Sequence, residues 1–204
     1  MNRALILRQG EELTRKLSAA SVAVCGLGGL GSNIAVSLAR AGTGKLILID
    51  FDRVDVTNLH RQQYRASQTG QYKTEALSEI LKEIAPYTEL EIHTERIDDT
   101  NVFSLLKGAD IVCEAFDDPG NKAMLTNIVL ECMPDKYLVA ASGMAGIDSG
   151  NSIRTRRLTE KFYLCGDGVS EVSEADCLLA PRVMLCAAHQ ALTVLRILSG
   201  RPEA

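Results

Sequence analysis

A short apolar segment followed by a glycine-rich turn constrains the fold of this chain more than any other feature. Residues 22–31 read VAVCGLGGLG, and the glycines stand in a Gly-x-Gly-x-x-Gly spacing at Gly26, Gly28 and Gly31. A helical pattern follows, and a second apolar run then closes on Asp50. A strand, glycine turn, helix, strand and acid in this order are typical of the βαβ unit that binds a nucleotide.

Each glycine of this turn has a physical purpose in a nucleotide site. Gly26 permits the tight turn, Gly28 has no side chain to hold a phosphate away, and Gly31 lets the helix approach the strand. The N-terminus of the helix offers free N–H groups and the positive end of its dipole to phosphates. Asp50 is placed to accept hydrogen bonds from ribose hydroxyls. The unit predicts a bound nucleotide, NAD or ATP, and the alternative is a structural turn without a ligand.

Strands and helices alternate along the chain. The predicted strands cover residues 21–26, 45–50, 89–93, 109–113 and 137–141. The predicted helices cover residues 30–41, 71–85, 101–106, 119–132 and 181–198, after one or two short helices within residues 1–20. This alternation predicts an α/β fold with a Rossmann-like, mostly parallel sheet and helices on both faces. Residues 152–158 and 161–164 are expected to form a late antiparallel pair before the C-terminal helix.

The composition limits the partners of the chain. Its 204 residues suffice for a single domain with a sizeable core. The net charge of −4 disfavours a nucleic-acid surface. No apolar run approaches membrane-spanning length and no signal peptide is recognised, so we expect a cytoplasmic protein without a membrane partner. The six cysteines contain no CxxC pair, which favours reduced thiols.

A second motif, at residues 50–62, is more specific than the glycine turn. It reads DFDRVDVTNLHRQ and begins where the second predicted strand ends, at the sheet edge where open α/β folds bind ligands. It places carboxylates, amides and a cation beside the predicted phosphate site: Asp50, Asp52, Asn58, Gln62 and Arg61.

Two further charged residues are expected at the same sheet edge. Lys73 opens the next helix, and Asp117 follows the fourth predicted strand. An NAD site needs no Arg–Lys pair, whereas a triphosphate under attack needs cations and a carboxylate for Mg²⁺. Singly, such residues are often surface cations or turn caps. Together they favour ATP with Mg²⁺ on Asp117, and the absence of a Walker A pattern excludes a P-loop phosphotransferase.

These motifs resemble the ThiF/MoeB/HesA family, the prokaryotic relatives of ubiquitin-activating enzymes. The similarity extends over nearly the whole chain, and its matching pieces are residues 26–31, residues 50–62, Lys73, Asp117 and residues 190–191. It implies an adenylyltransferase that uses ATP to activate the C-terminal glycine of a small ubiquitin-fold sulfur carrier protein and releases pyrophosphate. The short length and the stretch KFYLCGD look most like the compact ThiF type of thiamine biosynthesis, with a ThiS-like carrier that ends in Gly-Gly.

The resemblance also implies roles for the matching residues. Gly28 and Gly29 would approach the phosphates, while Asp50 would hold the ribose. Asp117 would bind Mg²⁺. The phosphates and the transition state would be contacted by Asn58, Arg61 and Lys73.

Two residues outside these motifs gain roles from the resemblance alone. Arg3 matches an arginine that enters the partner subunit's site in the family, which implies a homodimer. Cys177 matches a cysteine that can link covalently to the carrier. Only Cys165 resembles one of the family's four zinc-ligand positions, which implies that zinc is lost.

The resemblance divides the single domain into two parts. Residues 21–141 would bind the nucleotide and residues 142–204 the carrier, whose tail would pass beneath residues 166–176. A carrier of the molybdopterin type would leave the same sequence pattern. An NAD-dependent oxidoreductase stays open, although no His or Tyr is a credible proton donor, and so does a non-catalytic carrier-binding scaffold.

Overall fold

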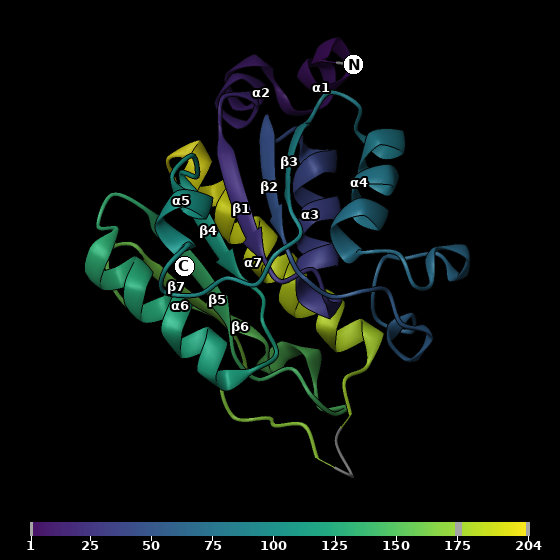
Figure 1. Ribbon diagram of the computed structural model, residues 1–204. Helices are drawn as coiled ribbons and strands as arrows, with labels where there is room; N and C mark the ends of the chain where they lie inside the picture. Colours follow the sequence, from purple (N-terminus) through teal and green to yellow (C-terminus); the bar gives the residue numbers. More distant parts are fainter. Residues whose placement is uncertain (1, 174–176, 203–204) are drawn as a thin grey trace.

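Seven strands form one sheet in the order β3-β2-β1-β4-β5-β7-β6, in which all neighbours are parallel except β6 and β7 (Figure 1). The computed structural model describes residues 2–173 and 177–202. The strands are β1 (Ser21–Cys25), β2 (Lys45–Ile49), β3 (Glu89–His93), β4 (Ile111–Glu114), β5 (Tyr137–Ala141), β6 (Arg154–Arg157) and β7 (Phe162–Gly166). The α-helices are α1 (Asn2–Gln9), α2 (Glu11–Ser18), α3 (Gly29–Ala41), α4 (Lys73–Ile84), α5 (Val102–Leu106), α6 (Pro119–Cys132) and α7 (Ala180–Ser199).

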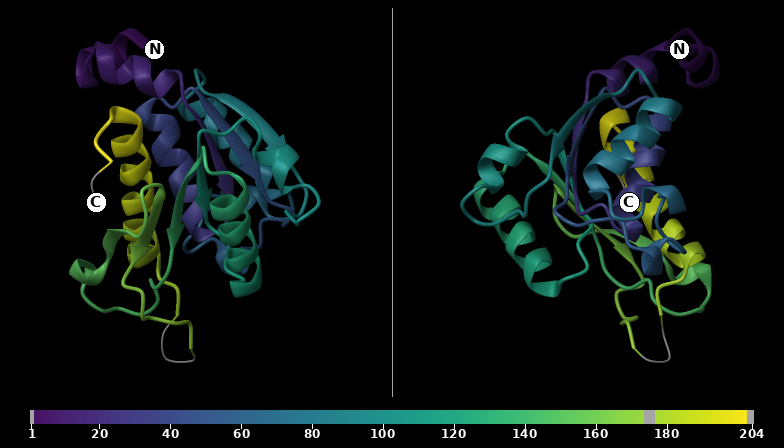
Figure 2. Two further views of the ribbon diagram at one scale, coloured as in Figure 1. Left: turned by 90° about the vertical axis from the view of Figure 1, so that its left-hand side faces the viewer. Right: turned by 45° about the vertical axis from the view of Figure 1, so that its right-hand side comes forward.

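Helices cover both faces of the sheet. One hydrophobic cluster joins the sheet to α3, α4 and α7, and a second joins its other face to α5 and α6. Figure 2 shows α1 and α2 at the end of the sheet where β1 begins. The predicted α/β class, the parallel sheet and the late antiparallel strands are therefore confirmed.

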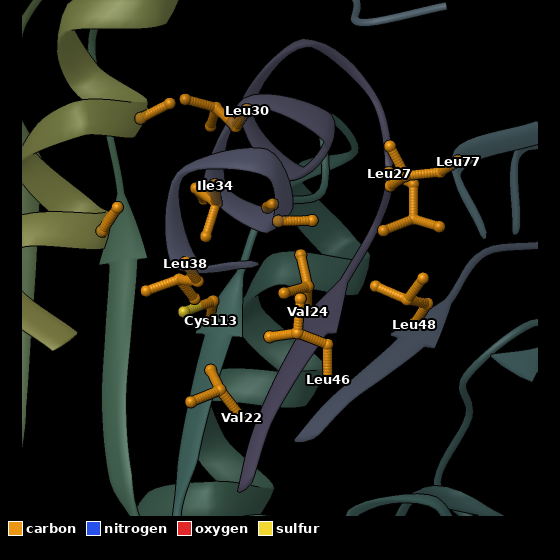
Figure 3. Packing of buried hydrophobic residues seen from close by; sticks show 14 of the residues in the cluster. Val22, Val24, Leu27, Leu30, Ile34, Leu38, Leu46, Leu48, Leu77 and Cys113 are labelled. Carbon is orange, nitrogen blue, oxygen red and sulfur yellow. The ribbon is translucent and has the colours of Figure 1, made fainter. Parts of the chain in front are cut away.

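The core between β1 and α3 explains why the glycine unit folds as predicted. Val22 and Val24 of β1 point toward Ile34 and Leu38 of α3, and these four side chains are fully buried (Figure 3). The apolar residues of β1 alternate with a period of two, whereas those of α3 recur at helical spacing. Gly42 ends α3 in the left-handed region with φ of 94°, as an αL cap requires.

The strand order creates one reversal point. The chain leaves β1 toward β2 and β3 on one side, and returns to place β4 on the other side of β1. Open α/β sheets bind ligands in the crevice outside the carboxyl ends of the strands at such a point. The end of β1 is the predicted glycine turn, so the topology and the motif agree on one location.

The remaining elements follow local signals that the sequence contains. Asp118 caps α6 by accepting a hydrogen bond from the Asn121 N–H at 2.8 Å, and Pro119 occupies the first turn. The described part of the chain also has three short 3₁₀ helices, which were not predicted because a three-residue turn has no periodicity. No helix in residues 2–173 and 177–202 is both long and apolar enough for a membrane span.

Candidate nucleotide-binding site

A cleft of about 500 Å³ lies at the carboxyl edge of the sheet, beside the ends of β1, β2, β4 and β5. Its walls come from the glycine turn, the residue 50–62 motif, the turn after β4 and residues 170–172. The predicted site residues that line it are Gly26, Gly28, Gly29, Asp50, Asp52, Arg61, Gln62 and Asp117. Two motifs and one carboxylate far apart in the sequence thus meet in one place.

The glycine turn brings strand and helix into contact. Gly26 has φ of +88°, and a Cβ there would lie 2.9 Å from the Ala115 carbonyl oxygen. A Cβ on Gly31 would lie 1.8 Å from the Gly26 oxygen, so only glycine permits this approach. Gly28 precedes α3 without a capping side chain, which leaves the first N–H groups of the helix for an anion.

Asp50 organises the turn from the end of β2. One carboxylate oxygen accepts from the Leu27 N–H at 2.6 Å, and the other accepts from the Asp52 N–H at 2.7 Å. Burial raises the pKa of Asp50, and the Lys73 ammonium opposes that shift. A carboxylate oxygen has the capacity for more than one hydrogen bond, so the predicted contact with ribose is compatible with these bonds.

Lys73 does not line the cleft but lies directly behind it. Its side chain is 8% exposed, and its Nζ donates to Asp52 Oδ2 at 2.7 Å and lies 3.9 Å from Asp50 Oδ2. Its backbone N–H donates to the Asp52 carbonyl at 2.9 Å, which fixes the start of α4 against the motif. The predicted phosphate contact therefore requires the ammonium to leave or share Asp52.

Arg61 lies against the glycine turn and lines the cleft. Its Cγ would be 3.4 Å from a Cβ on Gly29, and its guanidinium lies 3.3 Å from His60 Nε2. Partial burial lowers the pKa of Arg61, and the nearby charge of Asp117 opposes the shift. The guanidinium stays a cation, because arginine is not deprotonated in proteins. The cleft thus contains a cation and a carboxylate close together.

The two amides of the motif have different positions. Gln62 lines the cleft beside Gly28, and its buried Oε1 has no hydrogen-bond partner within the described part of the chain. A buried unpaired acceptor that borders a cleft fits a donor from a bound ligand, such as a ribose hydroxyl. Asn58 is half-buried in a 3₁₀ turn outside the lining, where its carbonyl accepts from the Arg61 N–H at 3.2 Å. Its predicted phosphate contact is not formed by the cleft as it stands.

Asp117 is the carboxylate assigned to a magnesium ion, and it is one of several acidic residues that line the cleft. It is exposed at the carboxyl end of β4, and in the described residues no three His, Cys, Asp or Glu side chains cluster to hold a metal. Mg²⁺ in nucleotide sites is commonly held by one or two carboxylates together with substrate phosphates and water. An exposed carboxylate in the same cleft as the uncapped start of α3 matches that pattern, so the residues fit the ion.

An ion pair beside Asp117 was not predicted from the sequence. Glu114, the last residue of β4, has a 1% exposed side chain, and Lys122 Nζ lies 3.0 and 2.8 Å from its two carboxylate oxygens. Burial raises the pKa of Glu114, and the Lys122 charge opposes that shift. Lys122 also lines the cleft. A charged residue closing the apolar run IVCE was the available signal, because such a residue needs a buried partner.

Neither Arg3 nor Cys177 is part of the cleft lining, although Cys177 directly precedes Leu178, which is. Arg3 is exposed on α1, which packs where α3 ends and thus at the opposite end of the sheet (Figure 1). Cys177 is exposed, and its carbonyl accepts from the Gly146 N–H at 3.0 Å. Of the predicted roof, residues 170–172 border the cleft, whereas residues 174–176 lie outside the described residues.

Comparison with known proteins agrees with this architecture. A profile of the ThiF family matches residues 1–204. The chain is 32% identical to the molybdopterin-synthase adenylyltransferase of Salmonella typhimurium, in a match that covers 98% of this chain and 83% of that protein. It is 35% identical to the adenylyltransferase and sulfurtransferase MOCS3 of Drosophila yakuba over 70% of this chain, which spans only 32% of that longer protein.

Solved structures show the same fold. The E. coli tRNA N6-threonylcarbamoyladenosine dehydratase in complex with ATP matches with a TM-score of 0.88 at 21% identity, over 98% of this chain and 93% of that one. E. coli MccB matches with a TM-score of 0.71 at 24% identity, over 94% of this chain and 58% of that one. The sheet, the glycine turn and a full-length profile match lead to one conclusion: the chain belongs to the ThiF family.

Proposed function

We propose that this chain is an adenylyltransferase that uses ATP to activate the C-terminal carboxylate of a ubiquitin-fold sulfur carrier protein. The observation that supports it most is the convergence of the uncapped start of α3, the Arg61 guanidinium and the Asp117 carboxylate on one cleft. The names of the similar Salmonella and Drosophila proteins, both adenylyltransferases, support the same reaction. So does the ATP complex of the E. coli structural neighbour.

The reaction needs no protein nucleophile. A carboxylate oxygen of the carrier's last residue attacks the α-phosphorus, the bond from that phosphorus to the bridging oxygen breaks, and pyrophosphate leaves with the electron pair. The chain contributes by positioning and by neutralising charge. The N–H groups of α3 and the Arg61 guanidinium hold phosphate oxygens, and Lys73 reaches them from behind Asp52. When bound to Asp117, Mg²⁺ neutralises charge on the phosphates.

The carrier tail enters from the side of the cleft that the C-terminal part of the chain forms. There the lining includes Ser142, Gly143, Ala145, Ser170 and Leu178, which leave room for an extended and slender peptide. A tail that ends in Gly-Gly fits because two glycines carry no side chains into the passage. We therefore assign nucleotide binding to residues 21–141 and carrier binding to residues 142–204. Cys177, exposed near this entrance, stays a proposed point of covalent linkage to the carrier.

Two carriers are candidates for the substrate of this reaction. A ThiS-like carrier of thiamine biosynthesis is the first candidate, on the basis of the residue 161–167 stretch. The Salmonella relative is named for molybdopterin synthase, so a molybdopterin-type carrier is the competing candidate. A cytoplasmic homodimer belongs to the same proposal.

ATP–pyrophosphate exchange with each purified carrier tests the proposal. Exchange that depends on one carrier and on its intact C-terminal glycine is the expected result. ATP binding without exchange for any carrier would favour a binding scaffold. Binding of NAD in preference to ATP would favour an oxidoreductase instead.

A further inference from the structure

A clamp formed by the Glu114–Lys122 ion pair holds the turn between β4 and α6, and it has no role in the proposed function. Glu114 Oε1 accepts a hydrogen bond from the Phe116 N–H at 2.8 Å. Lys122 Nζ donates to the Phe116 carbonyl oxygen at 3.0 Å. The two members of one ion pair therefore hold both backbone polar groups of the residue that precedes Asp117.

The Lys122 ammonium has no donor left for a phosphate. A lysine ammonium has three N–H groups. Those of Lys122 are directed to Glu114 Oε1 at 3.0 Å, Glu114 Oε2 at 2.8 Å and the Phe116 oxygen at 3.0 Å. Although it lines the cleft, Lys122 is therefore engaged in holding the turn rather than in binding a ligand.

The clamp rests on a rigid base. Glu114 is fully buried, and its backbone carbonyl accepts from Gln190 Nε2 at 3.0 Å, which ties the end of β4 to α7. The Ala115 N–H donates to the Cys25 carbonyl at 2.9 Å, which ties the turn to β1. Residues 116 and 117 lie between the anchored Ala115 and the cap of α6 at Asp118, and the ion pair holds the first of them.

We infer that Lys122 and Glu114 are positioning residues, which fix the Phe116 backbone so that the Asp117 carboxylate is held where it can bind the magnesium ion of Mg·ATP. This inference rests on the proposed function for its nucleotide. It extends that function, because it assigns a role to two residues that the sequence motifs do not contain. Groups that orient a metal ligand typically change metal affinity about 10–100-fold when they are removed.

The test measures ATP binding by calorimetry with Mg²⁺ and with EDTA, and so needs neither a carrier nor turnover. The dissociation constant of ATP in EDTA, divided by that in Mg²⁺, reports how much the metal contributes to binding. We expect Lys122→Met to reduce that ratio about 10–100-fold, and Lys122→Arg to restore it. Lys136→Met is the matched control, because Lys136 has an 8% exposed side chain and donates to the Ala109 carbonyl at 2.7 Å, where β4 and β5 begin.

Two double variants make the test decisive. If Lys122→Met alone does not fold because Glu114 is left unpaired, Glu114→Gln/Lys122→Met removes both charges and is measured in its place. In an Asp117→Asn background, Lys122→Met should cause no further change, since it acts through that carboxylate. A further loss of ATP affinity would show direct contact and overturn the inference.

The remaining outcomes separate the inference from the proposed function. An unchanged metal contribution in Lys122→Met would overturn the inference, even if the wild type exchanges pyrophosphate normally. ATP binding by the wild type that does not depend on Mg²⁺ would also overturn it. If no carrier supports exchange but the metal contribution follows Lys122, the positioning role stands and the proposed reaction fails.

Discussion

The ammonium of Lys73 lies 2.7 Å from the Asp52 carboxylate, although both residues were predicted to face the nucleotide. The Lys73 side chain is 8% exposed, whereas that of Asp52 is 50% exposed and lines the cleft. Asp52 therefore lies between the buried ammonium and the open cleft. ATP must therefore compete with Asp52 for this cation, or bind with the pair intact.

Lys73→Ala should lower ATP–pyrophosphate exchange by about 10²–10³-fold, the usual effect of removing a charge-stabilising group from a site of this kind. The steady-state exchange rate at saturating carrier measures it. Lys82→Ala is the matched control, because Lys82 is exposed near the end of the same helix. Near-wild-type exchange by Lys73→Ala would remove this residue from the reaction.

Asp117→Ala should abolish exchange and leave the far-ultraviolet circular dichroism unchanged, since its carboxylate is exposed. The neighbouring Asp118 provides the control. Asp118→Ala removes the cap of α6, which should cost about 1 kcal/mol of unfolding free energy while exchange persists. Equal loss of exchange in both variants would show that α6, rather than the Asp117 carboxylate, carries the effect.

Gly31→Ala should destabilise the fold by about 1–3 kcal/mol or more, because the new Cβ would lie 1.8 Å from the Gly26 oxygen. Urea unfolding at neutral pH measures the change. At Gly108 an added Cβ meets only Ile47 Cδ1 at 3.8 Å, so Gly108→Ala is expected to be tolerated. A stable Gly31→Ala variant would contradict the close contact of strand and helix.

Arg3 is expected to act on the site of a second subunit, because α1 lies at the opposite end of its own sheet. If so, Arg3→Ala and Lys73→Ala are each inactive but regain up to a quarter of wild-type exchange, as a rough statistical ceiling, when mixed and allowed to exchange subunits. Lys73→Ala mixed with Asp117→Ala is the control. Both residues belong to the site of one subunit, so every site in a mixed dimer keeps one defect and activity should not recover. No recovery in the Arg3 mixture would place the role of Arg3 outside catalysis in trans.

The Asp167–Arg182 ion pair predicts a pH effect on stability. Arg182 donates to Asp167 Oδ2 at 2.5 Å, and both side chains are 6% exposed. Burial alone would raise the pKa of Asp167, but hydrogen bonds from Ser170 and Val169, with the Arg182 charge, lower it below its usual value. A lowered folded-state pKa stabilises the fold above the unfolded-state value, about 3.9, and this contribution is lost as pH falls through the folded-state value.

Asp167→Asn should therefore destabilise the chain by about 3–5 kcal/mol at pH 7, since Arg182 is left buried without its partner. The difference in melting temperature from the wild type should shrink as the pH falls below about 4. Thermal unfolding across that range measures both. A difference that stays constant with pH would show that Asp167 stabilises through shape alone.

The parts of the site that could be predicted are those whose signals are local. The glycine turn and the residue 50–62 motif carry their own geometry, because φ near +88° at Gly26 and the contact at Gly31 depend on a few adjacent residues. The Glu114–Lys122 pair could not be predicted in the same way. It depends on which face of α6 lies against the sheet, and that face is chosen by packing between elements.

The hydrogen bonds of Gln190 relate the assembly of the sheet to the order in which the chain is synthesised. Its side-chain amide donates to the carbonyls of Glu114 at 3.0 Å and Val139 at 3.1 Å, and so ties the end of β4 and the middle of β5 to the last helix. During synthesis, the strands that border the cleft emerge from the ribosome before that amide does, because the last of them, β5, ends at Ala141, 49 residues before Gln190. The ties from Gln190 to the sheet therefore form only after every strand has left the ribosome.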